Sequence, residues 1–391
     1  MEQGDTTTTA TKRRVLPSAR VIAYEDGEVL TPSVVGFTKA GEVVVGRDVA
    51  ARRSELDPVV HDAKRFIGRA FADPSVAAQA KEYAFEVVRN GSRAAFRVGG
   101  GSRSVLPEVI GQHVVRRLVK EAKRDLGHDV ITSAVIAVPA AFDANQIVAT
   151  AEAFKLAGLR VARILKEPVA AAVAYGLNKV PGIDHVLVYD FGGGTLDVSV
   201  LYVQDGSVEV VANHGDNNLG GTDFDHCLAN AMRDKLLLLH GDTKDDTESA
   251  ILLTVSQEDE DPPPLDLDDD CDGAMLRLAE TMKIDLTEHA SATARCRRRQ
   301  DSVVARFTVT RDAFETTLCG HLFERAVGVV RETLETGMIR KADVDEVVLV
   351  GGTSRIPKVR ADLKDALQVD RLNTDIDPDV TVAVGAACVI D

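Results

Sequence analysis

The sequence predicts an α/β fold, because short apolar strands alternate with amphipathic helices along most of its 391 residues. The stretch 185–197, HVLVYDFGGGTLD, contains a buried strand that ends at an aspartate, a turn of three glycines and a returning strand. Glycine pairs at 220–221 and 351–352 also stand beside predicted strand or helix ends. Because glycine carries no side chain, each turn predicts a place where a ligand can approach the main chain closely.

The first half of the chain carries the signals of alternating strands and helices. Apolar residues at helical spacing predict a helix over 106–126, which Gly127 ends. Asp143 is a candidate N-cap for the following helix, and Gly158 ends that helix. The predicted elements are strands at 20–24, 31–38 and 42–45, a short helix at 49–56, a hairpin at 82–98, the helix at 106–126, a strand at 133–138, a helix at 143–157 and a strand at 159–165.

The second half repeats the pattern around the glycine turns. The predicted elements are strands at 195–202 and 207–212, helices at 223–240 and 274–286, a strand at 303–309, a helix at 311–336, a strand from 345, and a helix at 380–389. Residues 241–273 contain EDEDPPPLDLDDDCD, which predicts a disordered acidic loop. A calcium site is the alternative, but the EF-hand glycine and terminal glutamate are missing. The polar residues 1–14 predict a disordered tail.

Composition excludes several classes of protein. The chain has 46 basic and 61 acidic residues and a net charge of −15, which argues against nucleic-acid binding. No apolar run is long enough to insert into a membrane and no signal peptide is visible, so we expect a cytoplasmic protein. The five cysteines lack CxxC spacing and predict neither a disulfide framework nor a zinc site.

The glycine turn after the strand at 186–189, which Asp190 ends, is the main candidate for chemistry. Successive N–H groups in such a turn can form an anion-binding concavity. Asp190 would repel a bare phosphate, which makes sense if this carboxylate holds a hydrated Mg²⁺. Thr195 adds a hydroxyl donor. The alternative is a hairpin with a glycine turn and a solvated aspartate.

Other candidate residues also have structural interpretations. Lys64 stands among basic and apolar residues, where a lysine is usually solvated. Glu167 precedes Pro168 at a predicted helix start, where the helix dipole alone favours a carboxylate. Glu280 and Lys283 lie one turn apart, which usually means an exposed ion pair. The guanidinium of Arg355, after the third glycine turn, could stack on a base.

Five stretches in the same order resemble the nucleotide-binding domain of the seventy-kilodalton heat-shock (stress-70) chaperone family. They are DAKRFIG, LKEPVAAAVAYG, VYDFGGGTLDVSV, NNLGGTDFD and VLVGGTSRIPKVR, and the match runs from about residue 20 to 389. Within the family, the chain is most similar to a microsomal core ATPase that lacks a substrate-binding domain. The resemblance implies the actin-like ATPase fold, in which two lobes, each with a central mixed β-sheet flanked by helices, hold ATP and Mg²⁺. Residues 15–184 and 374–391 would form lobe I, and residues 185–373 lobe II.

The resemblance also implies roles for individual residues. Lys64 would aid hydrolysis of the γ-phosphate, and Glu167 and Asp190 would position water and Mg²⁺, the metal being held through water. Thr195 would complete the catalytic set. The remaining nucleotide contacts would be Gly192, Gly193, Gly194, Asp197, Gly220, Gly221, Glu280, Lys283, Thr287, Gly351, Gly352, Arg355 and Asp379.

The chain departs from the family pattern in a few places. The family opens with a strand, an aspartate and a Gly-Thr-Thr turn, whereas this sequence begins to match near Arg20. The first two strands and the first phosphate loop of lobe I would therefore be missing, and we expect weak ATP hydrolysis. Lys166 and Val169 replace the asparagine and threonine of the family's NEPTAA segment, and Thr222 replaces a glutamate.

Three functions are compatible with these residues. The first is the ATP-binding core of a heat-shock-type chaperone that slowly hydrolyses Mg-ATP to ADP and phosphate. The second is a degenerate nucleotide-binding scaffold that binds co-chaperones without significant hydrolysis. The third is a sugar or small-molecule kinase of the same superfold.

The resemblance implies J-domain proteins and nucleotide-exchange factors as partners. It also implies association with the endoplasmic reticulum if the N-terminus is truncated.

Overall fold

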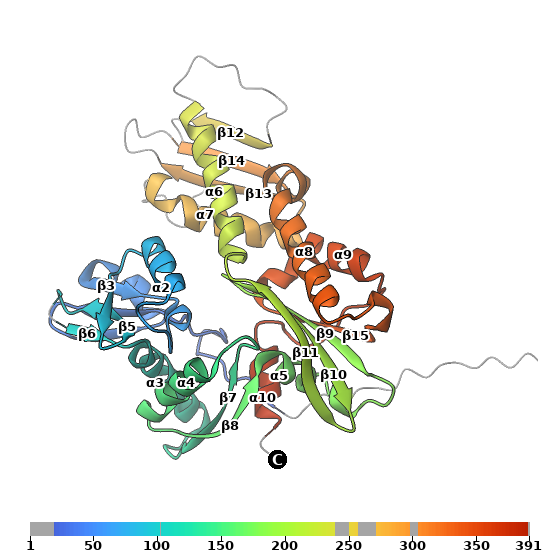
Figure 1. The fold of residues 1–391 in the computed structure, drawn as a ribbon. Coiled ribbons are helices and arrows are strands. Elements are labelled where there is room, and N and C mark those ends of the chain that lie inside the picture. The colour runs from blue at the N-terminus through green and yellow to red at the C-terminus, as the bar shows by residue number, and fades with distance from the viewer. Residues whose placement is uncertain (1–18, 102, 239–249, 257–270, 298–303, 390–391) are drawn as a thin grey trace, which may run out of the picture. The chain divides into compact units, whose positions relative to one another are not determined.

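The computed structural model describes residues 19–101, 103–238, 250–256, 271–297 and 304–389 (Figure 1). Contacts divide the chain into two compact units. Unit 1 comprises Met1–Gly176 and Val380–Asp391, and unit 2 comprises Leu177–Asp379. Among the described residues, no helix is long and apolar enough to cross a membrane.

The first part of unit 1 contains two small antiparallel sheets. Their strand orders are β2-β1-β3 and β4-β5-β6. Phe66, Phe85 and Phe96 form an aromatic core beneath them, and each of these side chains is buried. The strands are β1 (Val35–Thr38), β2 (Val43–Val45), β3 (Leu56–Val60), β4 (Val87–Asn90), β5 (Arg93–Val98) and β6 (Arg103–Val105). The helices between them are α1 (Asp48–Ala51), η1 (Arg53–Glu55), η2 (Ala63–Arg65), α2 (Pro74–Gln79) and η3 (Ala80–Glu82).

The second part of unit 1 is built on a parallel pair of strands. Strands β7 (Ser133–Val138) and β8 (Arg160–Lys166) pair with Val138 opposite Lys166. Helix α3 (Pro107–Leu126) packs against α4 (Ala144–Leu156). Asp143 caps α4 through a capping box with Gln146, as its position predicts. Helix α5 (Glu167–Ala174) packs against α10 (Thr381–Ala387) from the end of the chain (Figure 1).

Unit 2 has a mixed sheet of order β11-β10-β9-β15. Strand β9 (His185–Phe191) is antiparallel to β10 (Leu196–Gln204) and parallel to β15 (Glu346–Val350), while β11 (Ser207–Asp216) covers the other edge of β10. The apolar run of β9 is almost entirely buried, as its β-branched sequence predicts. Helix α8 (Gly320–Thr336) packs on β10 and β11, and α9 (Pro357–Leu367) packs on α8.

A second, antiparallel sheet of unit 2 has the order β12-β14-β13 (Figure 1). Helices α6 (Gly221–Leu238) and α7 (Cys271–Glu288) contact each other and this sheet. Phe224 of α6 is fully buried and lies against three other phenylalanine rings of the same core. The remaining elements are β12 (Ile251–Ser256), β13 (Ser291–Arg297), β14 (Val304–Thr310), the π-helical segment η5 (Ala313–Leu318), and the 3₁₀ turns η4 (Leu177–Lys179), η6 (Lys341–Asp343) and η7 (Gly352–Arg355).

Several predicted elements are wrong in part. Residues 20–24 are not a strand, since they find no strand partner and end in a turn in which the Gly27 amide donates to the Tyr24 carbonyl. The predicted helix at 311–336 is interrupted at Cys319, between η5 and α8. Within the predicted loop 241–273, Ile251–Ser256 forms β12 because it pairs with β14. Residues 241–249 and 257–270 of that loop, the last two residues of the helix predicted at 223–240, and the predicted tail at 1–14 lie outside the described residues.

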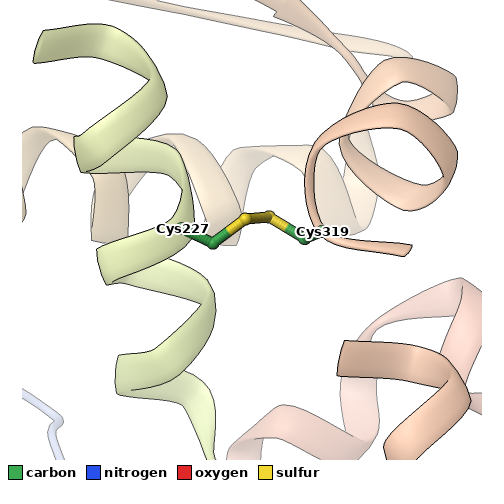
Figure 2. Close-up of a disulfide and its surroundings, with 2 residues drawn as sticks. All are labelled: Cys227 and Cys319. Carbon is green, nitrogen blue, oxygen red and sulfur yellow. A yellow bond between two sulfur atoms is a disulfide. The ribbon is translucent and has the colours of Figure 1, made fainter. Parts of the chain in front are cut away.

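The prediction from the cysteines is also wrong. Cys227 of α6 is disulfide-bonded to Cys319 just before α8 (Figure 2). Cys271 at the start of α7 is bonded to Cys296 of β13. Sequence separations of 92 and 25 residues carry no local signal, so only the tertiary fold reveals these pairs. Cys388 belongs to neither of these two disulfides.

Candidate functional site

The hairpin between β9 and β10 places two carboxylates together. The Gly192 amide donates to the Thr195 carbonyl at 3.0 Å, which closes the turn. Asp190 at the end of β9 lies directly opposite Asp197 of β10. Side chains of opposed residues in an antiparallel pair share one face of the sheet, and like charges placed there repel each other. A cation at this position would relieve that repulsion.

The second and third glycine segments meet this turn through hydrogen bonds. The Gly221 amide donates to the Gly192 carbonyl at 3.0 Å, and the Thr222 amide donates to the Gly193 carbonyl at 2.7 Å. From the third segment, the Thr353 hydroxyl donates to the Gly192 carbonyl at 2.8 Å. The structure therefore brings the three glycine segments to one place in unit 2.

Close approach explains why these positions are glycine. A Cβ on Gly220 would lie 2.4 Å from the Gly194 nitrogen, and one on Gly351 would lie 2.3 Å from the Phe191 carbonyl oxygen. Gly351 also has a φ of +79°, which L-residues with side chains rarely adopt. Gly193 is different, because a Cβ there would meet nothing within 4 Å. The turn thus has a packed side at Gly220 and Gly351 and an open side at Gly193, where no described residue beyond the chain neighbours would contact a Cβ.

Helix α7 adds a row of polar residues next to Gly221. The Lys283 ammonium donates to the Gly221 carbonyl at 3.0 Å and lies 2.7 Å from Asp225 Oδ1. This ion pair is largely buried, and burial raises the pKa of Asp225 although Lys283 opposes the shift. Glu280 is exposed one turn before Lys283, and the Thr287 hydroxyl donates to the Ile284 carbonyl one turn after it.

Arg355 is held beside the third glycine segment by two carboxylates. Its guanidinium donates to Asp377 and, at 2.9 Å, to Asp379. A Cβ on Gly352 would lie 3.1 Å from Asp379 Oδ1, so this carboxylate sits directly over the glycine. The Arg355 side chain stays 41% exposed, and a planar guanidinium can stack on an aromatic ring or a base.

In unit 1, Lys64 and Glu167 form an ion pair. Lys64 Nζ of η2 lies 3.1 Å from Glu167 Oε1 at the start of α5. Next to Lys64, Asp62 accepts hydrogen bonds from His61 and the Tyr83 hydroxyl. The bond with His61 lowers the pKa of Asp62, and burial raises the pKa of Tyr83 to about 12.

Three residues at these sites have no role among the sequence-derived assignments. Thr353 joins the third glycine segment to the first, and Asp377 orients Arg355 together with Asp379. Asp225 neutralises Lys283. The DPD motif at 377–379 was visible in the sequence, but the partners of Thr353 and Asp225 depend on tertiary packing.

The donor set fits a hydrated magnesium ion better than a fully protein-bound metal. Within the part of the chain that the structure describes, no group of three or more His, Cys, Asp or Glu side chains could hold a metal ion. Mg²⁺ keeps several waters and binds through one or two carboxylates plus phosphate oxygens. The opposed Asp190 and Asp197 are suited to that mode.

The mixed sheet, the aspartate hairpin and the converging glycine turns define the class of actin-like ATPase folds. The family model described as "Hsp70 protein" matches residues 15–391. The chain is 38% identical over 373 residues to the heat shock 70 kDa protein BIP3 of Oryza sativa subsp. japonica, covering 94% of this chain and 52% of that relative. It is 38% identical over 371 residues to the chaperone protein dnaK of Cyanidioschyzon merolae, covering 94% of this chain and 57% of that relative.

The chain therefore belongs to the Hsp70 family, and the predicted resemblance and fold class are confirmed. It spans about half the length of these curated relatives.

Proposed function

We propose that this chain binds Mg-ATP and Mg-ADP in unit 2 and slowly hydrolyses ATP, as the nucleotide-binding part of a heat-shock-type chaperone. The observation that carries the proposal is the convergence of three glycine segments beside the Asp190–Asp197 pair. Backbone amides and side-chain-free turns are suited to phosphate groups.

The phosphates would contact the open side of the Gly192–Gly194 turn, Thr195 and the start of α6 at Gly220 and Gly221. Asp190 and Asp197 would hold Mg²⁺ through water. When bound, this ion neutralises charge on the phosphate oxygens. The hydrogen bonds that the Thr353 hydroxyl and the Gly221 amide donate to the Gly192 carbonyl would hold the turn in place.

The nucleoside would lie along α7 and the third glycine segment. Glu280, Lys283 and Thr287 share one face of α7, since they are spaced by three and four residues. Arg355 would stack on the base, and its two carboxylate partners restrict the guanidinium in advance. Gly351, Gly352 and Asp379 would form the floor beside it.

For Lys64 and Glu167 of unit 1 we propose the roles that the family resemblance implies. The lysine would stabilise charge on the transferred phosphoryl group, and the carboxylate would orient the attacking water. Their ion pair at 3.1 Å keeps both groups together. Thr222, which stands where the family pattern has a glutamate, leads us to expect slow turnover.

The cellular setting is part of the same proposal. We expect J-domain proteins and nucleotide-exchange factors as partners. Protein disulfides persist in oxidising compartments and are rare in the cytosol. The Cys227–Cys319 and Cys271–Cys296 bonds therefore favour a lumenal compartment, in agreement with the endoplasmic-reticulum association that the resemblance implies, over the cytoplasm.

The test is calorimetric titration of Mg-ADP, with single-turnover hydrolysis of Mg-ATP as the second measurement. Glu280→Ala should weaken Mg-ADP binding by roughly 1–3 kcal/mol, the range for a hydrogen bond to a charged group. Glu288→Ala, an exposed acid on the same helix, is the matched control and should bind normally.

Three outcomes separate the alternatives. Unchanged affinity in Glu280→Ala would remove the assignment of α7 and leave Glu280 as a surface charge. No Mg-ADP binding by the wild-type chain would refute the proposal as a whole. Tight binding without detectable hydrolysis would favour the nucleotide-binding scaffold.

A further inference from the structure

Lys166 has a contact set that its position in the sequence does not explain. It is the last residue of β8 and the N-cap residue of α5, immediately before Glu167. Its ammonium lies 3.3 Å from the Pro139 carbonyl oxygen, 2.9 Å from that of Ala140 and 3.2 Å from that of Phe142. All three acceptors belong to the turn between β7 and α4.

The chemistry of the ammonium matches this turn. A lysine ammonium has three donors and no acceptor, so three carbonyl oxygens use its whole hydrogen-bonding capacity. The side chain is half-buried, where a charge needs such partners. Lys166 is therefore not available as a phosphate ligand in this arrangement, although it adjoins a proposed catalytic residue.

The bonds join the ends of two neighbouring strands. Val138 at the end of β7 lies opposite Lys166 in the parallel register, and the turn that follows β7 leads to the Asp143 cap of α4. The next residue after Lys166 begins α5 and carries the Glu167 carboxylate. Movement of the turn would thus shift the backbone from which Glu167 projects.

We propose that Lys166 is a positioning residue for Glu167, acting by fastening the turn at 139–142 to the end of β8. The inference rests on the proposed hydrolytic function. It also accounts for one departure from the family pattern, since an asparagine amide offers two donors where the lysine offers three. At position 166 this chain thus uses a charged ammonium group to hold the backbone of the turn at 139–142.

The experiment compares Lys166→Met, which keeps a chain of similar length without donors, with Lys155→Met as control. Lys155 is an exposed lysine of the same unit whose nearest carboxylate is 3.8 Å away. Single-turnover and steady-state hydrolysis give kcat and KM for Mg-ATP. Amide hydrogen exchange of peptides covering 139–146 and 166–170 reports on the turn and on α5 without requiring activity.

For Lys166→Met we expect kcat to fall about ten- to a hundredfold, because small misplacements of a catalytic group have effects of that size. The KM for Mg-ATP should change less than about twofold, since nucleotide binding is assigned to unit 2. Exchange should become faster in the turn and at the start of α5. Lys166→Asn, which keeps two donors, should be intermediate in both readouts and guards against misfolding of the methionine variant.

A double variant isolates the route of the effect. In a Glu167→Gln background, Lys166→Met should lower kcat little further, while it should still speed exchange in the turn. An equal fold-loss in both backgrounds would show that Lys166 acts on the fold generally and would overturn the inference.

The two proposals fail differently. If Glu167→Gln abolishes hydrolysis but Lys166→Met leaves kcat unchanged, only the positioning role is lost. If the wild-type chain neither binds nor hydrolyses Mg-ATP, the proposed function is lost, and the role of Lys166 falls with it.

Discussion

The two units support their candidate site residues in different ways. In unit 2, five of the seven residues of β9 are buried, and the strand lies between two neighbours. In unit 1, none of the seven residues of β8 is buried, and Ile164 is 41% exposed. Asp190 therefore projects from a buried strand that is paired on both sides, whereas Glu167 directly follows a strand whose residues are half-buried or exposed.

The difference shows that two carboxylates with proposed roles at one site need not rest on equivalent packing. Parallel strands are usually buried on both faces, and a two-stranded sheet alone is marginally stable. The order of Glu167 must therefore come from other contacts. These are the packing of α5 against α10, the ion pair with Lys64, and the Lys166 bonds to the β7–α4 turn.

The largest contrast should appear when one apolar side chain is removed from each unit. Phe224→Ala should destabilise unit 2 by about 3–5 kcal/mol, because it empties a fully buried position within an aromatic cluster. Ile164→Ala on β8 should stay within about 1 kcal/mol. Urea unfolding followed by circular dichroism measures both, and equal losses would show that β8 is covered in solution.

The Cys227–Cys319 bond should give the next largest effect. Replacing both cysteines by alanine should cost about 2–4 kcal/mol of stability, chiefly because the unfolded chain gains freedom. Cys388→Ala is the matched control and should melt much more like the wild type than the double variant does, since Cys388 belongs to neither disulfide. Reductant should lower the melting temperature of the wild type, because it breaks this bond. In the double variant the bond is already absent, so reductant should cause no loss of stability through it. If the wild type melted identically with and without reductant, the disulfide would not be stabilising.

Gly385→Ala tests the helix pair that carries Glu167. A Cβ at Gly385 of α10 would lie 1.8 Å from the Ala170 carbonyl oxygen of α5, so the helices must separate. We expect a loss of about 1–3 kcal/mol, typical of overpacking. Gly328→Ala in α8 meets nothing within 4 Å and should instead be neutral or stabilise by up to about 1 kcal/mol, because alanine favours helix. If Gly328→Ala destabilised the protein as Gly385→Ala does, or if both variants stabilised it, the close packing of α5 against α10 would be contradicted.

The smallest effect should come from Asp62 near Lys64. The hydrogen bond with His61 lowers the pKa of Asp62 below its ordinary value of 3.8, so the unfolded chain binds a proton more readily there. The resulting stability is present above about pH 4 and is lost as the pH falls through the lowered pKa. Asp62→Asn should reduce stability by less than about 1 kcal/mol at pH 7, since the side chain is 48% exposed, and should weaken the acid-side loss.

The control for Asp62 is Asp129→Asn, because the Asp129 side chain is 95% exposed. Stability is measured by urea unfolding between pH 3 and pH 7, a range chosen to bracket the ordinary aspartate pKa of 3.8. A parallel pH profile for wild type and Asp62→Asn would show that His61 does not hold this carboxylate in solution.

What the sequence could predict was local. The buried strand before Asp190, the glycine turn and the Asp143 cap follow from neighbouring residues, and the structure contains all of them. The strand expected at 20–24 fails because strand formation depends on a partner elsewhere. Strand β12 was hidden within an acidic stretch, since only pairing with β14 organises it.

The same distinction holds for the candidate site: its local features could be predicted from the sequence, but its tertiary contacts could not. Glycines at 192–194, 220–221 and 351–352 could be selected from their sequence context, whereas their mutual hydrogen bonds could not. The Lys283–Asp225 pair joins two helices whose contact no periodicity predicts. Lys166 lies within a recognised stretch of sequence, but its hydrogen bonds to the turn at 139–142 could not be predicted from that stretch.

The Cys227–Cys319 bond has a consequence for the covalent connectivity of unit 2. Gly192 and Gly221 precede the bonded segment, and Gly351 follows it. A single cut of the backbone anywhere between the two cysteines would therefore leave all three glycine segments in one covalent molecule. Electrophoresis would show one band without reductant and two fragments with it. A nicked chain could thus retain its candidate nucleotide site until a thiol separates the pieces.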